Sequence, residues 1–470
     1  MSKPFKMTLI ALAALVALAA LGAFLLSRVD TKSRFEVMAS EITGLEVAVN
    51  GSVSIRAFPT PHVVLQQVTL RNQQVQIASV GTADIGVAFW PLLRRQVRIT
   101  RLALHDLNVV IERDRSGRLN FTQPSAVNRP VPAMTLGRVS LAKTSFSYIN
   151  QQSGKEIKTI DCKFDSDAVQ LAQGSSAGIM KNLSLVARVK CAEVRNNLLV
   201  GTDVDFSVTG EQGHFKFVPV TMQIMGGKGA GTIGADFTGA VPAYQVHYAV
   251  TQLQVNDLFK SFAPGKAGEG VMNFTADLSM RGFNADEMTR TAQGEASLRG
   301  ENIELAIGNL DEKLAHYESS QNFNLIDVGA FFIAGPLGTA VTKGYNFTSI
   351  FRGAEGNTQV RILLSQWKVE DGVARAQDVV MATRENRLVM KGALDFVNSE
   401  FDDVTVAFVD QRGCALVEQK IVGPFSKPEV RKPNVLVSMT GPVTKLIGKA
   451  KKAVGIKCEV FYEGSVAPLG

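Results

Sequence analysis

One short segment places serine at a spacing that could do hydrolytic chemistry. Residues 174–178 read Gly-Ser-Ser-Ala-Gly, the Gly-x-Ser-x-Gly pattern of a nucleophile elbow. That elbow requires a strand before the serine and a helix after it. Residues 183–189 instead alternate apolar and polar side chains, as strands do. We therefore interpret the motif as a loop of small residues and the hydrolase as the weaker alternative.

A second motif, residues 229–234, matches the Gly-x-Gly-x-x-Gly pattern that binds dinucleotides where it opens a helix. Here Pro242 and a further alternating segment, residues 244–250, come after it. A glycine-rich bend between strands fits this context better. The histidines show no metal-binding spacing. We therefore expect no enzyme activity, no metal ion and no cofactor.

The cysteines form no Cys-x-x-Cys pair and fall into two pairs that lie far apart in the sequence. This arrangement suits two disulfides in an oxidising compartment, and four reduced core cysteines are the alternative. The predicted pairs are Cys162 with Cys191 and Cys414 with Cys458.

Residues 7–26 form an uncharged apolar run. A helix of about twenty residues rises about 30 Å, the thickness of a hydrocarbon core. Cleavable signal peptides have shorter apolar cores, so we expect an uncleaved single-pass anchor, with a signal peptide as the alternative. The flanking charges nearly balance and give no orientation. The anchor residues are Leu9, Ile10, Leu12, Leu15, Leu18, Leu21, Phe24 and Leu25.

The rest of the chain alternates apolar and polar residues with a period of two, for example at 204–208, 274–280 and 404–408. Long helices do not interleave with these segments, which favours antiparallel strands. The net charge of +7 over 470 residues is weak, and we expect no nucleic-acid partner. Helical patterns are few and lie at residues 255–262, 285–291, 309–318 and 440–455.

The last of these helical segments is basic on one side and apolar on the other. It could rest on anionic lipid headgroups or, alternatively, cover a sheet edge with its lysines in solvent. The headgroup-contact candidates are Lys445, Lys449, Lys451 and Lys452.

Several degenerate motifs, taken in order, resemble those of AsmA-like proteins. The amino-terminal set includes residues 44–53, 90–99 and 117–121, and the carboxy-terminal set includes residues 225–233 and 421–428. The resemblance covers most of the chain. It implies a mainly β fold, with the transmembrane helix followed by an elongated, curled antiparallel sheet and a few short helices. The predicted regions are 1–30 (cytoplasmic tip and anchor), 31–130 and 266–470 (AsmA-like β regions) and 131–265 (a middle β region).

The resemblance also implies a location and a function. AsmA-like proteins are anchored in the inner membrane of Gram-negative bacteria, with the body in the periplasm. They are related to bridge-like lipid-transfer proteins, so we expect phospholipid as the ligand and a role in lipid movement and outer-membrane homeostasis. The alternative is a non-enzymatic scaffold or assembly factor that binds outer-membrane or periplasmic proteins through strand edges.

A lipid groove would be lined by the apolar face of the strands, because strand side chains alternate between faces. An ordinary sandwich core produces the same alternation and is the alternative. The groove candidates are Val97, Ile99, Leu102, Leu104, Leu183, Leu185, Phe274 and Leu278.

Overall fold

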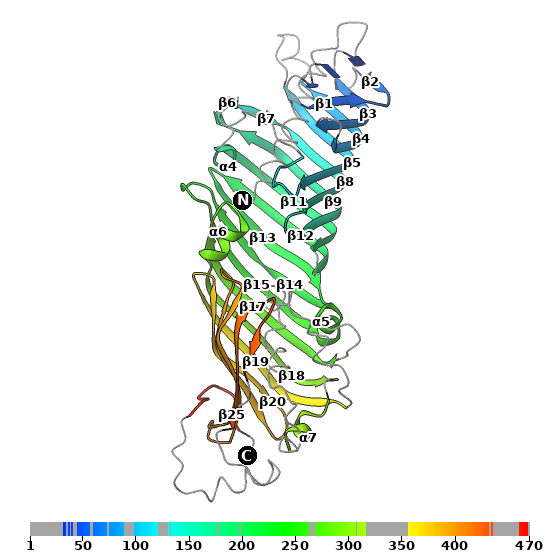
Figure 1. Ribbon diagram of the computed structural model, residues 1–470. Helices are drawn as coiled ribbons and strands as arrows, with labels where there is room; N and C mark the ends of the chain where they lie inside the picture. Colours follow the sequence, from blue (N-terminus) through cyan, green and yellow to red (C-terminus); the bar gives the residue numbers. More distant parts are fainter. Residues whose placement is uncertain are drawn as a thin grey trace, which may run out of the picture. The chain divides into compact units, whose positions relative to one another are not determined.

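The structure of the chain is a computed structural model (Figure 1). It describes residues 32–33, 36–37, 39–40, 45–56, 60–72, 75–88, 98–120, 130–131, 133–175, 178–196, 199–262, 268–306, 308–315, 356–431, 434–435 and 460–468.

The described chain is mainly β, as predicted, with a few short helices. The helices are α4 (Ile179–Asn182), α5 (Val255–Phe262), α6 (Ala285–Arg290) and α7 (Leu310–Ala315). The first twelve strands are β1 (Glu46–Val49), β2 (Val53–Arg56), β3 (His62–Asn72), β4 (Val75–Val87), β5 (Ile99–Arg113), β6 (Pro130–Val131), β7 (Met134–Leu136), β8 (Arg138–Asn150), β9 (Lys155–Leu171), β10 (Gly174–Ser175), β11 (Leu183–Asn196) and β12 (Val200–Glu211). The others are β13 (His214–Ile224), β14 (Gly227–Asp236), β15 (Ala243–Gln254), β16 (Gly268–Glu269), β17 (Val271–Arg281), β18 (Gln293–Leu305), β19 (Thr358–Glu370), β20 (Val373–Ala382), β21 (Arg387–Asp395), β22 (Glu400–Val409), β23 (Ala415–Pro424), β24 (Glu429–Val430) and β25 (Asn434–Val435).

The helices predicted at 255–262, 285–291 and 309–318 correspond to α5, α6 and α7. The segment 440–455 lies outside the described residues, and so do the anchor residues 7–26. Within the described part of the chain, no helix has the length and apolarity needed to cross a membrane.

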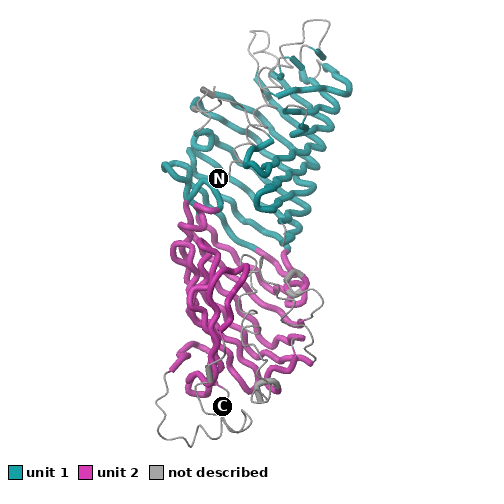
Figure 2. Tube along the Cα trace, viewed as in Figure 1, with its two compact units in different colours: residues 1–223, 230–244, 282–285 teal, residues 224–229, 245–281, 286–470 magenta. Residues whose placement is uncertain are grey.

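The described residues group into two compact units (Figure 2). Unit 1 comprises Met1–Gln223, Ala230–Tyr244 and Gly282–Ala285, and unit 2 comprises Ile224–Gly229, Gln245–Arg281 and Asp286–Gly470. The predicted boundaries 130/131 and 265/266 stay predictions.

Unit 1 begins with a broken edge strand, because β1 and β2 both pair with β3. The antiparallel order then runs from β3 to β4 and from β4 to β5. The next pairing, between β5 and β8, is parallel, with Leu102 opposite Val139. This pairing corrects the expectation of a wholly antiparallel sheet. In a parallel pair both strands run in the same direction, so β8 begins at the end of the sheet at which β5 begins.

Beyond β8 the sheet of unit 1 is antiparallel again. β8 pairs with β9, β9 with β11, and β11 with β12. The two-residue strands β6 and β10 form a separate small sheet.

Unit 2 contains an antiparallel series in which β17, β18, β19, β20, β21, β22 and β23 pair in chain order. Its last strand, β23, is flanked by two short strands, β24 and β25. In each unit, one edge of the sheet is therefore made of two short strands.

Each unit has its own apolar core. In unit 1 the core is deepest on β3, β4 and β5, where Leu65, Ile85 and Leu104 are almost fully buried. In unit 2 it is deepest on β19 to β22, and Val255 and Leu258 of α5 pack into it.

Candidate functional site

The candidate site is an apolar face on several strands of each unit. These strands, called the middle strands below, are β9, β12 and β13 in unit 1 and β15 and β17 in unit 2. On β17, Phe274 and Leu278 are half-buried, whereas Thr275 and Asp277 between them are exposed. Because strand side chains alternate, Phe274 and Leu278 share one face. This face keeps apolar surface open to solvent, which a sealed core does not.

The same arrangement recurs in unit 1. On β9, Phe164 is half-buried between the exposed Lys163 and Asp165. On β13, Phe217 is half-buried beside the exposed Lys216. The middle strands thus carry large apolar side chains that are neither buried in a core nor scattered singly.

The predicted groove residues divide into two groups. Ile99, Leu102, Leu104 and Leu183 are buried, with relative exposures of 5%, 1%, 2% and 4%, and belong to the core of unit 1. Leu185, Phe274 and Leu278 are half-buried against the cores of their units. Val97 lies outside the described residues. The structure therefore brings only the second group to an accessible apolar face.

Sequence reasoning missed the aromatic side chains of this face. A signal for them was present, since residues 163–165 read Lys-Phe-Asp and residues 205–207 read Asp-Phe-Ser, each an aromatic between polar neighbours. The half-buried aromatic residues that were missed are Phe146, Tyr148, Phe164, Phe206, Phe217, Tyr244 and Tyr248.

Ring contacts join half-buried and buried aromatic side chains within unit 1. The ring centroids of Phe206 on β12 and Phe217 on β13 are 5.8 Å apart in an edge-to-face arrangement. Phe215 contacts Phe237 at 5.5 Å, and Phe237 contacts Tyr244 at 6.1 Å. Such pairs stabilise the packing beyond the area that they bury and fix the ring orientations.

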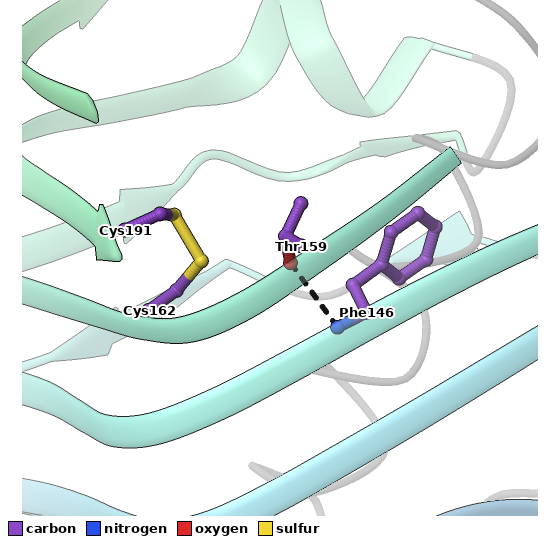
Figure 3. Close-up of a disulfide and its surroundings, with 4 residues drawn as sticks. All are labelled: Phe146, Thr159, Cys162 and Cys191. Carbon is purple, nitrogen blue, oxygen red and sulfur yellow. Dashed lines mark hydrogen bonds between the residues drawn. A yellow bond between two sulfur atoms is a disulfide. The ribbon is translucent and has the colours of Figure 1, made fainter. Parts of the chain in front are cut away.

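A disulfide bond joins Cys162 on β9 to Cys191 on β11, which lie directly opposite each other (Figure 3). The two cysteines are almost fully buried in a small apolar cluster with Val204, and Phe206 and Met222 pack against this cluster. The disulfide therefore lies on the apolar face. Cys414 is also disulfide-bonded, and Cys458 lies outside the described residues.

The opposite face of the same strands is charged. Arg188 on β11 and Asp205 on β12 form an ion pair with an N–O distance of 2.8 Å, and Lys190 lies 3.2 Å from the same carboxylate. The hydrogen bond from Arg188 lowers the pKa of Asp205 below its usual value. Unit 1 therefore has an amphipathic sheet, with charge on one face and apolar side chains on the other.

The structure describes most of the two sequence motifs that resemble a dinucleotide-binding loop and a nucleophile elbow. Residues 229–234 lie inside β14, so this glycine-rich segment opens no helix. Gly174 and Ser175 of the other motif form the two-residue strand β10, and the four-residue helix α4 begins at Ile179 and leads straight into β11. Within the described residues, no group of three or more His, Cys, Asp or Glu side chains is placed to hold a metal ion.

Asn120, in one of the family-like motifs, completes the backbone pairing of β5. Its side-chain oxygen accepts a hydrogen bond from the N–H of Glu112 at 3.0 Å, and its Nδ2 donates to the carbonyl of Val110 at 3.0 Å. The asparagine in that motif therefore has a structural role.

The headgroup-contact candidates and the anchor residues lie outside the described part of the chain, so their roles stay predictions.

The fold and the site define a class of protein: β-rich, with amphipathic strands whose apolar face is partly open. A family model described as the AsmA family matches residues 1–179 and 177–379. The chain therefore belongs to the AsmA family. No curated protein and no solved structure matches it.

Proposed function

We propose that this chain is a non-enzymatic lipid-transfer protein that binds phospholipid acyl chains on the apolar face of its middle strands. In this proposal it is anchored in the inner membrane by residues 7–26 and extends into the periplasm. There it supports phospholipid movement and outer-membrane homeostasis. Membership of the AsmA family is consistent with such a role.

The observation that carries the proposal is the set of half-buried apolar side chains on neighbouring strands within each unit. A lipid in water exposes its acyl chains, and each buried CH₂ contributes about 0.8 kcal/mol. A two-chain lipid therefore leaves a bilayer slowly. Neighbouring strands with apolar side chains, such as Phe206 and Phe217, would keep the chains out of water while the lipid moves in small steps.

The charged face of the unit 1 sheet, opposite the apolar face, supports the same proposal. The ion pair between Arg188 and Asp205 keeps that face hydrated, so acyl chains have only one face to occupy. A sheet with one hydrated face and one accessible apolar face suits an apolar ligand better than a polar one.

The scaffold alternative requires an exposed strand edge long enough to pair with a partner. In unit 1 the edge strand β1 is covered, because the N–H of Val49 donates to Oε1 of Glu36 at 2.7 Å and the N–H of Val47 donates to Oγ of Ser40 at 2.9 Å. In unit 2 the strands flanking β23 are two residues long. These features are typical of edges protected against pairing.

Site-specific photo-crosslinking tests the proposal. A photoreactive amino acid at Phe274 or Leu278 is expected to capture phospholipid in cells. The same group at Thr275, on the opposite face of β17, is expected to capture none and is the matched control. Polypeptide adducts in place of lipid at Phe274 would favour the scaffold. Equal lipid capture at all three positions would contradict a one-sided binding face.

A further inference from the structure

A line of residues with left-handed backbone conformation crosses the sheet of unit 1. These residues have φ angles of 48° to 55°, and they are Gln67 on β3, Asp106 on β5, Lys143 on β8, Asp161 on β9 and Asp203 on β12. Strand residues normally have φ angles of about −120° to −140°. Residues other than glycine rarely adopt the left-handed conformation, and aspartate and asparagine tolerate it best. Its recurrence on five strands of one sheet is therefore a feature of the fold and not a local irregularity.

The strand register places these residues in line with one another. Gln67 and Asp106 lie opposite the same residue of the strand between them, Gly81 on β4. A Cβ atom at Gly81 would lie 3.0 Å from the Cβ atom of Asp106, so the glycine makes room for this close approach. In the parallel pairing of β5 with β8, Asp106 aligns with Lys143. The line therefore crosses β3, β4, β5 and β8.

The line continues across β9, β11 and β12. Asp161 on β9 and Asp203 on β12 both lie opposite Ala192, on the strand β11 between them. The disulfide bond joins Cys162, which follows Asp161, to Cys191, which precedes Ala192 (Figure 3). It therefore ties two strands together directly beside this line, which is called the bend line below.

The bend line shifts the alternation of its strands by one residue. On β12, Gly201 and Val204 are buried, whereas Thr202 is half-buried and Asp203 is exposed between them. In a regular strand only one residue separates neighbours on the same face. The buried residues of β3 and β5 show the same three-residue interval. The extra residue lengthens the exposed face relative to the apolar face, and extra residues of this kind bend strands.

We propose that the bend line makes the apolar face of unit 1 concave, and that Asp203 is a positioning residue for bound lipid. Phe206 lies on the apolar face of β12 just beyond the bend, is half-buried, and its ring contacts that of Phe217. A concave face surrounds an acyl chain more completely than a flat face and so buries more of its CH₂ groups. The role of Asp203 rests on the lipid binding proposed above, since it shapes the surface that the acyl chain would occupy.

Two substitutions at Asp203 separate the effect of its backbone conformation from that of its charge. Both Asp203→Gly and Asp203→Val remove the carboxylate. Glycine adopts the left-handed conformation freely, whereas a β-branched residue such as valine is disfavoured there by roughly fivefold to thirtyfold. A photoreactive amino acid at Phe206 measures lipid contact in cells. Asp203→Val is expected to lower lipid capture at Phe206 by a factor up to this range, and Asp203→Gly is expected to leave it unchanged.

Phe274 in unit 2 supplies the matched control position. It lies on the candidate lipid-binding face, and its strand β17 contains no residue of the bend line. Lipid capture at Phe274 should be the same in the wild type and in both variants. This control separates a local change at the bend from a loss of the whole fold.

Several results would overturn the inference. These are unchanged capture at Phe206 in Asp203→Val, lost capture at Phe206 in Asp203→Gly, or a wild type that captures lipid at Phe274 but none at Phe206. Loss of capture at both positions in Asp203→Val would also overturn it, because the conformation would then serve the stability of the fold as a whole. A wild type that captures no lipid at either position would instead contradict the proposed function itself.

Discussion

At the scale of single residues, burial separates the apolar side chains that hold the fold from those that could meet a ligand. Leu104 is 2% exposed in the core of unit 1, whereas Leu278 is half-buried on the open face of unit 2. Both residues follow the same period-two pattern in the sequence. The pattern tells which face a side chain is on, and only the tertiary structure tells what covers that face.

This difference predicts different costs of truncation. Leu104→Ala should lower the free energy of unfolding by about 2–5 kcal/mol, since it leaves a cavity in a packed core. Leu278→Ala should cost clearly less, because its site is already partly open. Urea unfolding of the two variants measures both values. Equal costs would contradict the assignment of Leu278 to an accessible face.

The disulfide between Cys162 and Cys191 carries a second prediction at this scale. It closes a loop with a sequence separation of 29, and in the loop-entropy model such a crosslink stabilises by about 3–4 kcal/mol. The double variant Cys162→Ser, Cys191→Ser should lose that amount in urea unfolding. Non-reducing peptide mapping of the wild type is the control, and free thiols at both positions would contradict the bond.

At the scale of elements, the alternation of the sequence predicts several of the strands. The predicted bounds of helix α5 agree with the structure. Strands β11, β17 and β22 contain the segments whose alternation predicted them. The parallel pairing of β5 with β8 was not predictable, because alternation does not encode the direction of a partner strand. The aromatic face was recognisable only in part, since its accessibility depends on what packs over it.

The carboxy-terminal segment 460–468 covers the second face of the sheet in unit 2. Tyr462 and Val466 join an apolar cluster with Val380 and Val389. Residues 379–382 contribute alternately to this cluster and to the main core, so both faces of β20 are buried.

Polar contacts of Asp378 hold this segment in place. Its carboxylate accepts hydrogen bonds from the Tyr462 hydroxyl at 2.8 Å and from the Ser465 hydroxyl and N–H at 2.7 and 2.8 Å. The guanidinium group of Arg387 donates to the carbonyl of Val466 at 2.9 Å. The segment is therefore attached through buried, charge-assisted hydrogen bonds.

These contacts predict that Asp378→Ala lowers the free energy of unfolding by about 2–3 kcal/mol, as expected for hydrogen bonds to a buried charged group. The matched control is Asp277→Ala, which removes an exposed partner of His247 and should cost no more than about 1 kcal/mol. Urea unfolding compares them. An Asp378→Ala protein as stable as the control would show that the segment is not held by this carboxylate.

At the scale of the whole molecule, the proposed function combines an anchor predicted from the sequence with two β-rich units that the structure describes. Residues 7–26 are long and apolar enough to span a bilayer, but charge does not orient them. The predicted orientation, with the body in the periplasm, follows from the family.

That orientation predicts the outcome of proteolysis. Protease added to intact spheroplasts should digest the body of the protein if, as proposed, the body lies outside the inner membrane. A cytoplasmic protein in the same sample should stay intact until the spheroplasts are lysed. Protection of the body before lysis would place it in the cytoplasm and would contradict the proposed location.

The most direct test of lipid binding is native mass spectrometry of the full-length protein after extraction in mild detergent. The wild type is expected to carry phospholipid in a stoichiometric amount. The variant Phe274→Asp should fold, with an unchanged circular dichroism spectrum, because its site is open enough for water to reach the carboxylate. It should carry less lipid, since an ionised group on an apolar binding face costs several kcal/mol. A wild type that carries no phospholipid, or a stoichiometric polypeptide in its place, would contradict the proposal.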